Sequence, residues 1–140
     1  MRLVRFAKDG AGSYGVVEGE ALQPLAGAPW STGGVPKEAG EPLDRRVTPL
    51  LVPVVPTKIL GVGRNYRAHA QELGNEVPKE PLIFYKPPSS LLPHHGRVVL
   101  PKDAGRVDFE GELALVVGAR ARNVAKENWR DVIFGLTCAL

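Results

Sequence analysis

Two glutamates on either side of a single glycine, Glu110 and Glu112, are the side chains whose type and spacing most directly indicate chemistry. Successive side chains of a β-strand point to opposite faces, so in an extended segment both carboxylates would project from the same face. Like charges this close repel each other, and a hard divalent cation would relieve the repulsion. The pair therefore predicts a site for Mg²⁺ or Mn²⁺, with Ca²⁺ as the weaker candidate. A solvated strand face that carries two ordinary glutamates is the alternative.

A histidine and a glutamate three residues apart, His69 and Glu72, form the second candidate group. They lie in a run of helix-forming residues, where positions i and i+3 share one helix face. A carboxylate beside an imidazole orients the ring and raises its basicity, which is what a general base needs. The alternative is a surface helix on which the two side chains contact only solvent.

Three further polar residues lie near glycines or prolines, at the turns where binding residues are often found. Arg64 follows Gly63, Tyr66 comes two residues later, and Lys86 precedes two prolines. A lysine can bind a substrate carboxylate as a point charge, although a solvated lysine at a strand end explains Lys86 equally well. We interpret all three as candidate substrate-binding residues.

The elements that must position these side chains are short. A strand over 107–117 would place Glu110 and Glu112 on one face and the leucines at 113 and 115 on the other. Asn65 is expected to cap a helix over 66–73, and Gly74 to end it. The segment 24–49 has no periodicity and is expected to be a loop. We expect the other strands at 2–7, 13–18, 58–63, 82–85, 97–100 and 133–140, and one or two helical turns at 126–130. The pattern predicts a β-rich α+β fold with two units, 1–50 and 57–140.

Composition excludes several classes of protein. The 140 residues contain 16 Gly and 13 Pro, which argues against a bundle of long helices. The net charge is only +3, without a run of like charges, and aromatic residues make up 6%, so a nucleic-acid partner is not expected. The longest apolar tract, 49–56, is too short to cross a membrane. One cysteine, Cys138, fits a reducing cytoplasm.

Four motifs follow one another from residue 57 onward: Ile59–Tyr66 with His69 and Glu72, Phe84–Pro87, Asp108–Ala114 and Val132–Thr137. In this order they resemble the fumarylacetoacetate hydrolase family. The hairpin predicted near the N-terminus is similar to the small leading module of many bacterial members. The resemblance implies a mixed β-sandwich roll, of which residues 57–140 are the N-terminal part, after that β-hairpin module.

The resemblance also implies roles for the candidate residues. Glu110 and Glu112 would be metal ligands, usually for Mg²⁺ or Mn²⁺, and His69 with Glu72 would be the acid–base dyad. Lys86 would lie near the metal and the substrate. In the family an aspartate completes the metal site just beyond the last motif, where this chain ends. We therefore expect the chain to be the N-terminal portion of a longer enzyme.

The activity implied by the resemblance is that of a metal-dependent enzyme on a small anionic 2-oxo or 1,3-dicarbonyl acid, which reacts through a metal-bound enolate. The type expected is a 2-hydroxyhepta-2,4-diene-1,7-dioate isomerase or decarboxylase of aromatic catabolism. An acylpyruvate or fumarylacetoacetate-type C–C hydrolase is the alternative within the family. A non-catalytic assembly subunit is the alternative outside it. The expected partners are the keto-acid substrate and a second copy in a homodimer.

Overall fold

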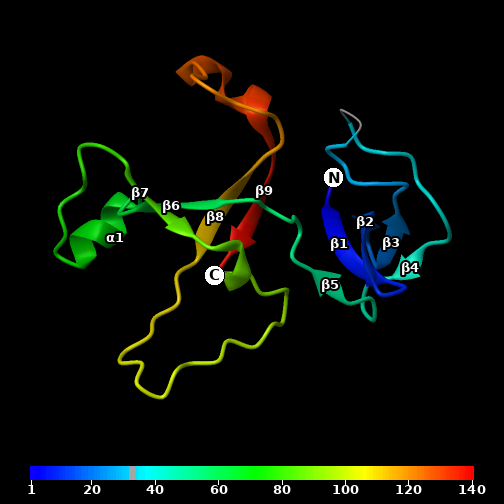
Figure 1. Cartoon of the computed structure of the whole chain (residues 1–140), viewed down its shortest axis with the longest axis horizontal. Coiled ribbons are helices and arrows are strands. Elements are labelled where there is room, and N and C mark those ends of the chain that lie inside the picture. Colours follow the sequence, from blue (N-terminus) through cyan, green and yellow to red (C-terminus); the bar gives the residue numbers. More distant parts are fainter. Residues whose placement is uncertain (32–33) are drawn as a thin grey trace.

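The computed structural model describes residues 1–31 and 34–140, and most of its regular structure is β (Figure 1). The described strands form one five-stranded sheet and two two-stranded sheets, and every strand pairing found among them is antiparallel. One short α-helix and two 3-10 helices complete the described elements. The β-rich α+β fold predicted from the sequence is therefore confirmed.

The five-stranded sheet builds the N-terminal module, which we define as residues 1–51. Its strands, in spatial order β4-β3-β2-β1-β5, are β1 (Leu3–Lys8), β2 (Ala11–Glu18), β3 (Ala21–Pro24), β4 (Leu43–Asp44) and β5 (Leu50–Leu51). Asp9 and Gly10 turn the chain from β1 to β2 with φ values of 50° and 77°, as a tight two-residue hairpin turn requires. Phe6 of β1 and Leu22 of β3 are fully buried. The module thus has a small core of its own.

The segment 24–49 was predicted to be a loop, and this prediction is wrong in part. It contains β4 and an isolated bridge between Leu25 and Glu38. β4 has two residues, too few to show an alternating pattern in the sequence. It forms because Leu43 pairs with Leu22 of the preceding strand, so the contact is set by tertiary structure.

The next ladder pairs β6 (Ile59–Gly63) with β7 (Leu82–Lys86), and the helix α1 (Arg67–Glu72) lies between them in sequence. Gly74 ends the helix as predicted, with a φ of 68° and its N–H donated to the Gln71 carbonyl at 3.0 Å. The predicted N-cap, Asn65, is wrong. Tyr66 occupies that position and no side chain caps the helix.

The last ladder is the β8–β9 hairpin. Its strands are β8 (Glu112–Val117) and β9 (Ile133–Ala139), and the 3-10 helix η2 (Lys126–Val132) leads into β9; a second 3-10 turn, η1 (Pro88–Ser90), follows β7. The strand predicted over 107–117 therefore begins five residues late. The ladder ends at the pair Glu112 and Ala139, so β9 offers no partner to residues 107–111. Residues 97–100, which were also predicted to form a strand, belong to none of the strands in the described residues.

Burial is unequal along the chain. Among the described residues, the buried hydrophobic side chains are Phe6, Val17, Leu22, Leu25 and Ala70, and only the last lies outside the N-terminal module. The strands β6 to β9 expose many large apolar side chains. In the described part of the chain, no helix is long and apolar enough to cross a membrane.

Candidate functional site

The helix α1 brings the predicted acid–base pair together. His69 Nδ1 lies 3.7 Å from the Glu72 Oε2, one turn apart on the same helix face. This distance allows an electrostatic attraction but is longer than a hydrogen bond. Both side chains are exposed, at 55% and 78%, so solvent weakens their coupling. The geometry fits a histidine oriented by a carboxylate, and its catalytic role stays a prediction.

The two glutamates of the predicted metal site occupy different local structures. Glu112 is the first residue of β8 and is half-buried, whereas Glu110 lies in the irregular segment before the strand and is exposed. The prediction that both project from one strand face is therefore wrong, because the strand begins only at Glu112. A shallow depression of about 380 Å³ opens at this end of the hairpin, and Glu112, Leu113 and Cys138 are among its lining residues.

Glu110 and Glu112 are the right type of ligand for a divalent cation, but two carboxylates are too few to complete its coordination. Carboxylate oxygens are the ligands that Mg²⁺ and Mn²⁺ prefer. Yet residues 1–31 and 34–140 contain no group of three or more acidic, histidine or cysteine side chains placed to share an ion. Asp108, the other acid of this motif, is paired with Arg106 at 3.0 Å. Glu110 and Glu112 would supply two ligands, which is short of a full coordination set.

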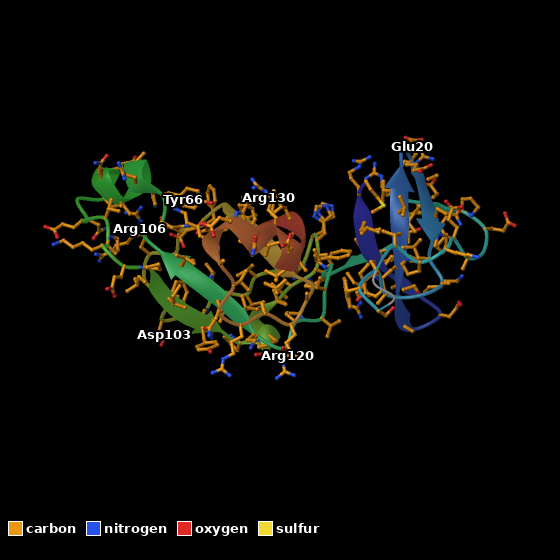
Figure 2. All side chains as sticks on the ribbon, turned by 90° about the horizontal axis from the view of Figure 1, so that it is seen from above. Glu20, Tyr66, Asp103, Arg106, Arg120 and Arg130 are labelled. Atoms are coloured by element: carbon orange, nitrogen blue, oxygen red, sulfur yellow. The ribbon has the colours of Figure 1, made fainter. Side chains whose placement is uncertain are left out.

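One hydrogen bond links the two candidate groups. The backbone N–H of Leu113 donates to the Tyr66 hydroxyl at 3.3 Å, across 47 positions of sequence. Tyr66 is the residue directly before α1, and Leu113 directly follows Glu112. Figure 2 shows Tyr66 between the α1 segment and the β8–β9 hairpin. The bond ties the residue before α1 to the strand that begins with Glu112. Tyr66 was predicted from the sequence to bind substrate, and nothing in the sequence indicated its hydrogen bond with Leu113.

The remaining predicted binding residues are separated. Arg64 follows the last residue of β6 and has a left-handed backbone, with a φ of 54°, which is uncommon outside glycine. Lys86 pairs with Ile59 at the opposite end of the same ladder. The four steps from Ile59 to Gly63 alone span about 13 Å, and Arg64 lies one residue further on, so the structure does not bring Lys86 to Arg64. Lys86 Nζ lies 6.0 Å from the centre of the Phe84 ring.

Comparison with known proteins places this geometry in a family. The family model described as "Fumarylacetoacetate (FAA) hydrolase C-terminal" matches residues 58–140, and a second, "Rv2993c-like, N-terminal", matches residues 1–53. Oxaloacetate tautomerase FAHD1, mitochondrial, of Arabidopsis thaliana is 52% identical over 84 residues, which cover 60% of this chain and 38% of that protein.

Solved structures cover nearly the whole chain. 2-Hydroxyhepta-2,4-diene-1,7-dioate isomerase from Mycobacterium marinum is similar with a TM-score of 0.78 and 31% identity. 5-Carboxymethyl-2-hydroxymuconate delta-isomerase from Mycobacterium smegmatis is similar with a TM-score of 0.80 and 29% identity. Each alignment covers 99% of this chain, but only 52% and 53% of those chains. The chain thus spans about half the length of these structures and less of the curated relatives. It belongs to the fumarylacetoacetate hydrolase family.

Proposed function

We propose that the protein is an isomerase of small anionic 2-oxo or 1,3-dicarbonyl acids, of the 2-hydroxyhepta-2,4-diene-1,7-dioate isomerase or decarboxylase type, and that it depends on Mg²⁺ or Mn²⁺. Family membership and the isomerase and tautomerase names among the similar proteins support this reaction class. The observation that carries the proposal is the Tyr66–Leu113 hydrogen bond, which ties the residue before the helix of His69 to the strand that begins with Glu112.

His69 would do the proton transfer. Its neutral imidazole would take a proton from the carbon beside the substrate carbonyl and return it to a different carbon, or to oxygen in a tautomerisation. The Glu72 carboxylate, 3.7 Å away, would orient the ring and stabilise the imidazolium that forms. Arg64, exposed beside Tyr66, is placed to attract an anionic substrate. Glu110 and Glu112 would hold the divalent ion, which when bound polarises a carbonyl group.

The test measures isomerase turnover of 2-hydroxyhepta-2,4-diene-1,7-dioate and enol–keto interconversion of oxaloacetate, with Mg²⁺, with Mn²⁺ and with a chelator. His69→Ala should lower kcat at least about 100-fold with little change in KM, because a general base acts mainly in the transition state. His94→Ala, in an exposed loop, is the matched control and should keep full activity. Near-full turnover of the His69 variant would remove the histidine from the mechanism.

The carboxylates are tested separately. Glu112→Gln should raise the Mg²⁺ concentration needed for half-maximal activity at least about tenfold. Glu127→Gln removes an exposed carboxylate in η2 and should change nothing. If the products of either substrate are two smaller acids, the reaction is C–C hydrolysis, the other activity that the family name indicates. If no candidate substrate reacts and Mg²⁺ does not bind, the assembly-subunit alternative is favoured.

A further inference from the structure

We propose that Trp30 is the anchor of an internal docking surface that fixes the N-terminal module to the β8–β9 hairpin. Its indole contacts Tyr14 of β2 with ring centres 5.0 Å apart and planes at 80°. It also contacts Phe134 of β9 at 5.6 Å and 88°. Both are edge-to-face contacts at the separations that aromatic rings prefer. Three rings therefore form a continuous bridge between two parts of the chain that Figure 1 shows as separate sheets. This inference does not depend on the proposed function.

Phe134 lies at an irregularity of the β8–β9 ladder. In the β8–β9 register, Val116 pairs with Gly135 and Val117 pairs with Ile133, so Phe134 is the extra residue of a β-bulge. A bulge bends its strand and redirects the side chain of the unpaired residue. Gly118 makes room for it, since a Cβ at that position would lie 2.5 Å from the Cβ of Phe134. The bulge and Gly118 together set the position of the Phe134 ring.

A hydrogen-bonded turn of the N-terminal module carries Trp30. The indole is carried by the turn Ala28–Ser31, in which the Ser31 N–H and hydroxyl both donate to the Ala28 carbonyl, at 3.1 and 2.7 Å. Pro29 is at the second position of this turn, where its fixed φ is favoured, and it is fully buried. A rigid, anchored turn holds the ring in place at little entropic cost on docking. On the far side, burial raises the pKa of Tyr14, as expected for a hydroxyl covered by neighbouring groups.

The contact at Phe134 affects the whole length of the β8–β9 hairpin. β8 and β9 pair continuously from the bulge to the pair of Glu112 and Ala139. Holding Phe134 at one end therefore fixes the orientation of the strand that presents Glu112 at the other. The N-terminal module therefore holds the β8–β9 hairpin in place. The docking surface around Trp30 is occupied by a segment of the same chain.

Tryptophan fluorescence of the full chain tests the contact without changing Trp30. The chain has two tryptophans, so Trp129→Phe leaves Trp30 as the reporter. In that background, Phe134→Ala should shift the Trp30 emission to longer wavelength, because the indole loses its cover. Phe109→Ala removes a phenylalanine that is 87% exposed and should leave the emission unchanged. Identical emission in the two variants would overturn the proposal.

Limited trypsin digestion then measures docking. Trp30→Ala should speed cleavage at Lys58, in the segment 52–58 that joins the module to β6, by about two- to tenfold, as the loss of an aromatic pair predicts. Trp129→Ala should be cleaved at the original rate. Adding Phe134→Ala to Trp30→Ala should give no further acceleration, because each removes the same contact. Additive effects would refute a shared contact. If Trp30→Ala loses the far-UV circular dichroism of the original protein, the fluorescence test decides alone.

Discussion

Removing one hydroxyl tests whether Tyr66, the residue before the helix of His69, is bonded to the strand that begins with Glu112. Tyr66→Phe keeps the ring and deletes only the oxygen that accepts the Leu113 N–H at 3.3 Å. An intramolecular hydrogen bond contributes about 0.5–1.5 kcal/mol net, since water competes for both partners. Tyr66 and Leu113 are 44% and 56% exposed, so water can replace the lost acceptor. We therefore expect the lower end, about 0.5 kcal/mol.

Amide hydrogen exchange measures this change at the donor itself. About 0.5 kcal/mol corresponds to roughly a twofold faster exchange of the Leu113 amide in Tyr66→Phe. The amide of Ala114, the next residue along the strand, points towards β9 and pairs with Thr137, so it is the internal reference and should keep its rate. Tyr85→Phe, which removes a hydroxyl from a side chain that is 74% exposed, is the matched control.

Two results would refute the reasoning. Unchanged exchange at Leu113 would mean that the hydroxyl does not accept this N–H in solution. An equal acceleration at Leu113 and Ala114 would mean that the substitution loosens the whole β8–β9 hairpin, so that Tyr66 acts through packing of its ring instead of through the hydrogen bond.

Three further substitutions test local features. Gly15→Ala should lower the free energy of unfolding by about 1–3 kcal/mol in urea denaturation, because its Cβ would lie 2.8 Å from the Gln23 carbonyl oxygen inside the module. Gly74→Ala should cost about 1 kcal/mol in the same assay, since φ is 68° with open space around it; an unchanged midpoint would contradict a left-handed helix end. Arg46 hydrogen-bonds to Asp44 and lowers its pKa to about 2, so this contribution to stability is complete above pH 3.8 and is lost as the pH falls through about 2. Arg46→Gln should return the Asp44 pKa towards 3.8 in a carbon-13 NMR titration, and a pKa still near 2 would exclude the arginine as its cause.

Features set by a few neighbouring residues were predicted correctly from the sequence. The N-terminal hairpin, which turns at Asp9 and Gly10, and Gly74 at the end of α1 need only the backbone freedom of those positions. Because His69 and Glu72 are three residues apart, the helix alone brings His69 Nδ1 to 3.7 Å from Glu72 Oε2. No distant part of the chain is needed for any of these, which is why a local pattern sufficed.

Features that need a partner far along the chain were missed. β4 exists because of Leu22, and the start of β8 is set by the end of its partner strand. The Tyr66–Leu113 hydrogen bond and the contact of Trp30 with Phe134 join residues 47 and 104 positions apart, respectively. Sequence periodicity reports which face of an element is apolar, but it does not report which other element that face meets.

The two faces of β8 show what the predicted alternation does explain. Glu112, Ala114 and Val116 are half-buried, whereas Leu113, Leu115 and Val117 are exposed, so the period of two holds wherever the segment is a strand. The carboxylate of Glu112 therefore shares its face with small apolar side chains on the more covered side of the hairpin. Partial burial removes water from a charged group and makes a compensating cation more valuable there than at exposed Glu110. If the pair does bind a divalent ion, Glu112→Gln should weaken binding more than Glu110→Gln, and the reverse order in a calorimetric Mg²⁺ titration would show that strand position does not decide the ligand.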